Sequence, residues 1–164
     1  MPGPLNPIQP ANFILDAIRN GQGFNYTSGV QVTAGAVNSL CMSVFNPNAS
    51  KLIYIYSVIA YENVSGNFGL LNHITADPAL GAAQVDNMLL GSPLASIASA
   101  TFTNVGVAQS GTVLQRCNMN TNYSEVEFLN NGSLFILPQN HGLAFFINIS
   151  AIGNWTVTFR GVEL

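Results

Sequence analysis

The stretch "KLIYIYSVIAYE", residues 51–62, limits what this chain can fold into more than any other. Read at a period of two, it has two faces: Leu52, Tyr54, Tyr56, Val58 and Ala60 on one, and Ile53, Ile55, Ser57, Ile59 and Tyr61 on the other. A strand with one face in water alternates apolar and polar residues. Here both faces are apolar, so each must be shielded from water by other protein. We expect one face in a core between two sheets and the other against a further protein surface.

Charge is scarce along the whole chain. Only 7% of the 164 residues are charged, against about a quarter in an ordinary soluble domain. Four basic residues and a net charge of −3 argue against a nucleic-acid partner or an anionic membrane surface. No apolar run reaches the ~18 residues that span a bilayer, and "MPGPLNPIQP" lacks the features of a signal peptide. We therefore expect a cytoplasmic product with neither membrane nor nucleic acid as its partner.

The first part of the chain predicts an arm and a helix rather than strands. Residues 1–10 hold four prolines, including Pro4, Pro7 and Pro10, which is typical of an extended segment. In "ANFILDAIRNG" one side at helical spacing carries Phe13, Ile14, Ala17 and Ile18, and Gly21 marks a stop. A helix of barely three turns is marginal alone. We assign residues 1–28 to this arm and helix, and expect the helix to lie on something.

From residue 29 onward the pattern is one of short strands separated by Gly, Asn and Pro turns. We predict strands near 30–34, 39–46, 51–62, 67–75, 84–90, 95–104, 111–118, 123–129, 133–137, 142–150 and 154–163. In the last of them Trp155, Val157 and Phe159 should point inward, and Thr156, Thr158 and Arg160 outward. Many short strands favour an all-β antiparallel sandwich over alternating βαβ units, so residues 29–164 form one β domain.

Two long runs resemble a family of small tailed-bacteriophage virion proteins with a single trimeric jelly roll. In "GFNYTSGVQVTAGAVNSLCMSVFNPNASKLIYIYSV" an Asn-Pro turn separates two strands before a Tyr-rich strand. In "NGSLFILPQNHGLAFFIN" a Leu-Pro and Gly turn separates two more before a final Trp-containing strand. The resemblance implies a jelly-roll sandwich that serves as a capsid decoration (cement) protein, a head fibre or a receptor-binding tip. These motifs are turns rather than chemistry, so they speak to the fold first.

A search for catalytic chemistry finds weak candidates. His73, with Asp77 nearby, and His141 have no metal-ligand spacing, and a cupin-like metal enzyme is a distant third hypothesis built on the two histidines. Glu125 and Glu127 share one strand face, as in a solvated or edge-protecting face. Cys41 and Cys117 are too few for a disulfide framework and read as buried thiols. We expect no enzyme, no metal and no cofactor.

The leading hypothesis is a homotrimeric cement protein on the phage head surface, bound to the major capsid protein and made in the host cytoplasm. The expected shell-binding residues are Pro4, Pro7, Pro10, Phe13, Ile14, Ala17 and Ile18. The expected subunit interface comprises Tyr54, Ile55, Tyr56 and Tyr61, because a second apolar strand face is typical of obligate oligomers. The alternative is a head fibre or tail protein that binds a host-surface glycan through loop residues such as Tyr123, Asn140 and His141.

Overall fold

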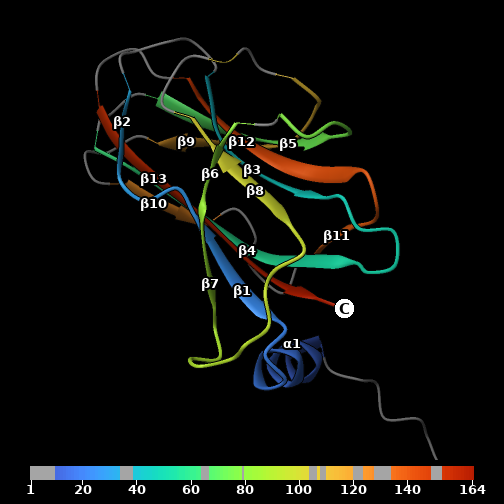
Figure 1. Cartoon of the computed structure of the whole chain (residues 1–164). Helices are drawn as coiled ribbons and strands as arrows, with labels where there is room; N and C mark the ends of the chain where they lie inside the picture. The colour runs from blue at the N-terminus through green and yellow to red at the C-terminus, as the bar shows by residue number, and fades with distance from the viewer. Residues whose placement is uncertain are drawn as a thin grey trace, which may run out of the picture.

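The chain is a sandwich of two antiparallel sheets with one short helix at its end (Figure 1). The computed structural model describes residues 10–33, 39–63, 67–78, 80–103, 107, 110–119, 124–127, 134–148 and 153–164. The only helix in these ranges, α1, spans Pro10–Arg19. The all-β prediction is confirmed at the level of a sandwich.

The first sheet has the strand order β10-β4-β13-β1-β7, with β11 also on β4 and β2 also on β13. Its strands are β1 (Gly23–Thr27), β2 (Gln31–Thr33), β4 (Ile53–Glu62), β7 (Gln84–Asn87), β10 (Ser124–Glu127), β11 (Phe135–Leu137) and β13 (Gly153–Glu163). We call it sheet A. The last strand, β13, therefore lies in the middle of the sheet, between β4 and β1.

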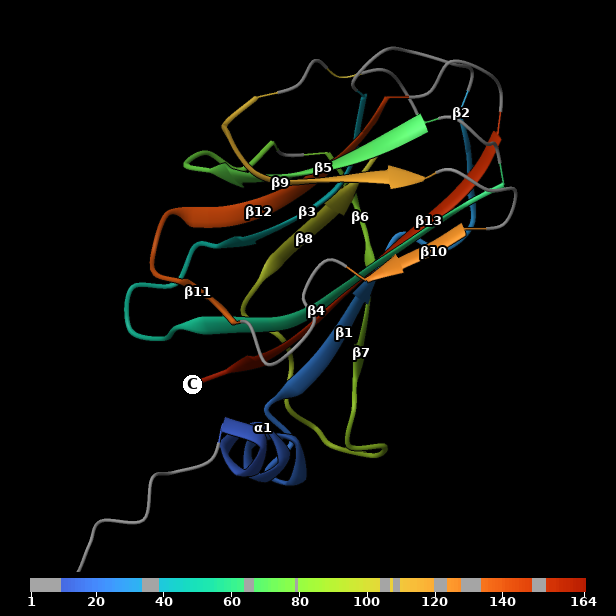
Figure 2. The ribbon, with the colours of Figure 1, turned by 180° about the vertical axis from the view of Figure 1, so that it is seen from behind.

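The second sheet, sheet B, has the order β6-β8-β3-β12-β5-β9. Its strands are β3 (Ser39–Asn46), β5 (Asn67–Ile74), β6 (Gly81–Ala82), β8 (Ser99–Phe102), β9 (Thr112–Met119) and β12 (His141–Asn148). The two sheets face each other across the core, as the view from behind also shows (Figure 2).

Strands that are far apart in the chain pair in a nested order. β1 and β2 pair with β13, β3 with β12, β4 with β10 and β11, and β5 with β9, all antiparallel. The chain thus runs out along one set of strands and back along the other. The connection between β5 and β9 supplies β6, β7 and β8, which extend one edge of each sheet.

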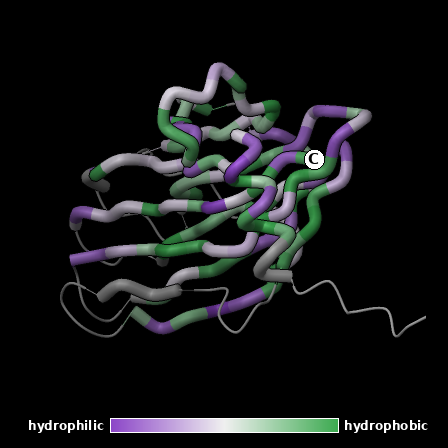
Figure 3. Tube along the Cα trace, turned by 90° about the horizontal axis from the view of Figure 1, so that it is seen from below, coloured by the Kyte–Doolittle hydropathy of each residue, from purple (hydrophilic) through white to green (hydrophobic). Residues whose placement is uncertain are grey.

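The core lies between the sheets and is built by alternate residues of their strands. Trp155, Val157 and Phe159 are fully buried while Arg160 is exposed, which confirms the predicted alternation in β13. The tube in Figure 3, seen from the helix end, shows hydrophobic and hydrophilic positions interleaved along the strands. A second, smaller cluster that includes Leu70 and Phe146 lies on the outer face of sheet B, packed against Leu80 and Val107.

A β-bulge corrects the two-face interpretation of residues 51–62. The pairing of β4 with β13 shifts between Arg160 and Gly161, so Ser57 opposes Arg160 while Ile55 opposes Gly161. The extra residue, Tyr56, moves the inward positions from odd to even numbers. The core-facing set is therefore Ile53, Ile55, Val58, Ala60 and Glu62. A strict period of two could not give this set.

The predicted strands from 39–46 onward correspond to observed ones, with ends that differ by a few residues. Two strands were missed. β6 is only two residues long, and β1 lies in the segment assigned to the arm and helix. The boundary at residue 28 is therefore wrong, because Gly23–Thr27 is an inner strand of sheet A. The alternation of Phe24 and Tyr26, both buried, is the signal that marks it.

Candidate functional site

Helix α1 covers the outer face of sheet A at one end of the sandwich. It starts at Pro10, a residue favoured in the first helical position. It ends in a Schellman motif, in which Gly21 N–H donates to the carbonyl of Ile18 and Gln22 N–H to that of Ala17. Gly21 has a φ of 75°, the left-handed conformation that the motif requires.

The apolar side of α1 lies directly on the sheet. The Phe13 ring meets that of Tyr54 edge to face, with centroids 5.4 Å apart. A Cβ on Gly23 would come within 2.6 Å of Ile18 Cγ1, so only glycine permits this approach. Part of the cover for the second face of β4 thus comes from the chain itself.

This packing changes the status of the predicted shell-binding residues. Ala17 is 4% exposed, so the prediction that it contacts a partner is wrong. Phe13, Ile14 and Ile18 are half-buried, and Pro10 begins the helix. Pro4 and Pro7 lie outside the described residues. We expected this helix to bind a partner, but most of its apolar surface packs against sheet A of the same chain.

The predicted subunit interface changes in the same way. Ile55 is fully buried in the core, so its assignment to an interface is wrong. Tyr54 packs under Phe13, and the Tyr56 hydroxyl donates to Met88 Sδ at 3.3 Å. Burial raises the pKa of Tyr56, against an opposing effect of Arg160. Tyr61 is half-buried on the outer face of sheet A.

Exposed apolar side chains occur on α1, in the segment after β7, and on or next to β4 and β11. We call this set the apolar rim: Leu15, Leu52, Leu89, Leu90, Leu94, Leu134 and Ile136. Leu90 is 93% exposed, at the tip of the turn after β7. That turn lies against the end of the helix, since Asn87 Nδ2 donates to the Gly21 carbonyl at 2.7 Å. Ile136 in β11 pairs with Tyr54 in β4, and the Tyr54 ring contacts Phe13 of the helix.

The rim was not predicted from the sequence. Its signal is "MLLGSPL", residues 88–94, where three leucines flank a Gly-Ser-Pro turn. A turn normally carries polar residues, so this composition indicates an exposed apolar loop. Charges near the rim are few: Asp16 and Arg19 on α1 pair at 3.4 Å, both well exposed, and Lys51 is exposed. Such a surface is suited to an uncharged apolar partner.

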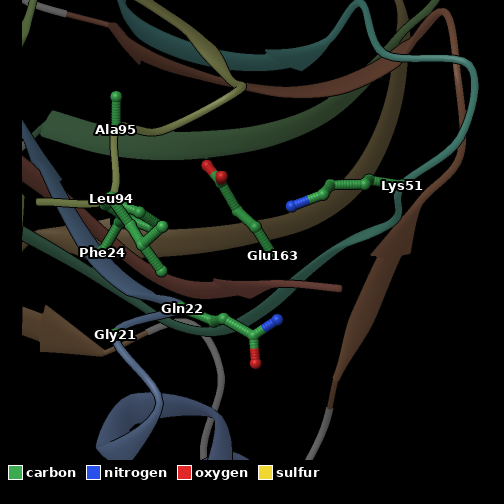
Figure 4. Close-up of a pocket in the computed structure, with 7 residues that line it drawn as sticks. All are labelled: Gly21, Gln22, Phe24, Lys51, Leu94, Ala95 and Glu163. Carbon is green, nitrogen blue, oxygen red and sulfur yellow. The ribbon is translucent and has the colours of Figure 1, made fainter.

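A small cavity lies beside the rim, lined by Gln22, Phe24, Lys51, Leu94 and Glu163 among others (Figure 4). Lys51 reaches toward the Glu163 side of it. The cavity measures about 40 Å³, room for a few water molecules and not for a sugar or a cofactor. It does not form a substrate site.

Glu163 serves as a structural acceptor at the wall of this cavity. Its carboxylate is 2% exposed and accepts hydrogen bonds from the Tyr26 hydroxyl at 2.7 Å, the Ser96 hydroxyl and the Ile97 N–H. Burial, and then the charge of Glu163, raise the pKa of Tyr26 well above its ordinary range. This cluster ties the segment after the rim to the core.

The two histidines come together although 68 positions separate them. His73 lies in β5 and His141 opens the neighbouring β12, and Nε2 of the first is 2.7 Å from Nδ1 of the second. Within the described residues no group of three or more His, Cys, Asp or Glu side chains is placed to hold a metal. Asn140, named as a glycan-binding candidate, is exposed at the turn before β12.

The sequence also named two glutamates, two cysteines and Tyr123 as candidates. Glu125 and Glu127 lie in β10, opposite Tyr61 and Ile59 of β4. Cys41 is buried and Cys117 half-buried, and neither forms a disulfide. Tyr123 lies outside the described residues. No described helix is long and apolar enough to cross a membrane.

Comparison of the chain with protein-family models, with curated proteins and with solved structures finds no match.

Proposed function

We propose that this protein is a trimeric jelly-roll protein of a bacteriophage virion, which decorates the head shell and stabilises it. The nested strand pairing supports the jelly roll. A jelly roll is a long antiparallel hairpin rolled into two sheets, so its first strand pairs with its last, its second with its seventh, and so on. β1, β3, β4, β5, β9, β10, β12 and β13 follow that order.

The apolar rim is the observation that carries the docking role. Large exposed apolar patches on a soluble protein mark interaction sites. The seven exposed side chains of the rim lie on α1, in the 89–94 segment beside the end of the helix, and on or next to β4 and β11. The Pro-rich arm precedes the same helix in the chain. We place the shell contact on the rim and the arm, with α1 as the rigid support between them.

Shell stabilisation would follow from mass action. A protein that binds assembled capsomers and not their separate subunits shifts the equilibrium toward the assembled shell. Three copies of the rim on one trimer would act together, and their avidity exceeds the affinity of a single contact by ~10²-fold or more. The shortage of charge supports the trimer, because eleven charged residues are few for an accessible surface of 8462 Å², and contact between subunits would take part of that surface out of water.

The test begins with the purified virion of the phage that carries the gene. Peptide mass spectrometry and labelled electron microscopy should find the chain on the head. Stripped heads should then rebind the wild-type protein, and the double variant L15S/L90S should bind at least tenfold more weakly. V113S/L114S, which changes two exposed apolar residues on β9 away from the helix, is the matched control.

Each negative result has its own meaning. Full occupancy by L15S/L90S overturns the rim as the contact. A chain found only on the tail, with glycan binding, favours the head-fibre or tail-tip alternative. A chain absent from virions overturns the proposed function as a whole.

A further inference from the structure

The chain contains only two histidines, and the fold places them against each other. Their ring planes differ by 11° and their centroids lie 5.0 Å apart. The facing nitrogens, His73 Nε2 and His141 Nδ1, share a hydrogen bond at 2.7 Å. Both rings are half-buried and therefore reachable from solution. Imidazole is the commonest metal ligand among protein side chains.

The backbone around the pair is tightly fixed. In the pairing of β5 with β12, His73 opposes Leu143, and His141 lies two residues further along the same face. Asn46 Nδ2 donates to the Leu137 and Lys51 carbonyls, which anchors the turn before His141. A Cβ on Gly111 would come within 2.1 Å of the His73 carbonyl oxygen, so glycine lets β9 start against this strand. Two ligands on adjacent rigid strands are a sound base for a metal site.

We propose that His73 and His141 form a binding site for a late divalent transition metal, of which Cu²⁺ and Ni²⁺ fit best. Metal–nitrogen bonds of about 2.0–2.1 Å place two cis nitrogens about 2.9 Å apart in a square-planar site and about 3.3 Å apart in a tetrahedral one. The observed separation of 2.7 Å between the two nitrogens is closer to the square-planar value. Each ring must also turn away from the N–N line, by roughly 45° for a right angle at the metal, before both lone pairs meet on one ion.

Proton accounting at the site is simple. In the hydrogen-bonded pair one facing nitrogen carries the proton and the other accepts it. When the metal binds, the donor ring moves its proton to its far nitrogen, so two neutral rings bind the ion without net proton release. Acid protonates imidazole and therefore competes with the metal. The remaining coordination positions go to water, since the described residues supply no third ligand of the His, Cys, Asp or Glu type close by.

The proposal stands apart from the virion role and is tested on the free protein. The experiment uses tag-free protein with the substitution Cys117→Ser, which removes the half-buried thiol as a competing ligand. One equivalent of Cu²⁺ should give an electron paramagnetic resonance spectrum with hyperfine splitting from two nitrogens. Ni²⁺ or Zn²⁺ at a hundredfold excess over its Kd should raise Tm by about 5–10 °C.

His73→Gln and His141→Gln should each abolish the two-nitrogen spectrum and the Tm increase, and circular dichroism without metal verifies that each variant folds. Thr112→Ala, opposite His73 on β9, is the control that should keep both responses. The proposal is overturned if no response occurs, if the double histidine variant responds like the wild type, or if one single variant retains the full response.

Discussion

Glu163 shows how one buried side chain holds three segments together. It lies on β13, and its donors are Tyr26 on β1 and the 96–97 segment that follows the rim. A buried carboxylate that accepts three hydrogen bonds has its hydrogen-bonding capacity satisfied. If the carboxylate were removed, its buried donors would have neither water nor a protein acceptor. The residue therefore acts on stability rather than on chemistry.

Glu163→Gln should destabilise the fold by about 2 kcal/mol, because the amide keeps one acceptor oxygen and turns an NH₂ group toward the donors. Denaturant unfolding measures the change. Glu125→Gln, a change of the same chemistry on β10, is the matched control. Equal stability of E163Q and the wild type would contradict the structural role of this carboxylate.

Tyr26 gives a pH prediction with a definite sign. Burial and Glu163 keep its phenol protonated in the folded chain, with a pKa above the ordinary value of 10.0. In the unfolded chain the phenol ionises near pH 10, so the folded state then binds more protons and stability falls as pH rises. Tm should decline between pH 9 and 11 more steeply in the wild type than in Tyr26→Phe. Identical slopes would contradict the buried hydrogen-bonded phenol.

The thiols should be slow to react. Burial raises the pKa of both Cys41 and Cys117, which lowers the thiolate fraction at pH 8. Ellman's reagent should modify Cys117 slowly in the folded protein and Cys41 only after denaturation. Fast modification of two thiols under native conditions would show that the core around Cys41 opens.

Among the elements, α1 gives a prediction about stability, because its packing on sheet A determines how much stability its removal costs. A ten-residue helix is marginal alone, so its order comes from Tyr54, Gly23 and their neighbours beneath it. Deleting residues 1–20 exposes that part of sheet A. The free energy of unfolding should fall by about 3 kcal/mol, because one buried and three half-buried apolar side chains of the helix are removed.

The truncated protein should therefore melt roughly 5–10 °C lower than the full chain, as differential scanning calorimetry would show. Deleting only residues 1–9 is the control and should leave Tm almost unchanged. An unchanged Tm after the longer deletion would mean that the helix does not stabilise the sheet it covers.

Most strands could be predicted from the sequence, and so could the inward face of β13, but not the inward face of β4. Trp155, Val157 and Phe159 alternate without interruption, so their burial followed from the pattern. In β4 the bulge at Tyr56 exchanges the two faces, and a bulge depends on the partner strand rather than on the residues themselves. The His73–His141 contact was equally out of reach, because it depends on which strands become neighbours in sheet B.

For the whole molecule, the scarcity of charge, 7% of residues, argues for self-association. We expect sedimentation velocity at micromolar concentration to give three times the 17.4 kDa mass of one chain. Because apolar contacts dominate, raising the salt from 0.1 to 1 M should not dissociate the trimer. A soluble monomer over this range would contradict the assembly.

The central position of β13 also governs when the protein can fold during its synthesis. Sheet A needs β13 between β4 and β1, and β13 ends at Glu163. While the ribosome is still making this segment, β4 and β1 have no strand to join them, and their apolar faces remain open. The sandwich thus completes itself only after residue 163 has left the exit tunnel. Until then, chaperones that shield exposed strands are the natural protection against aggregation.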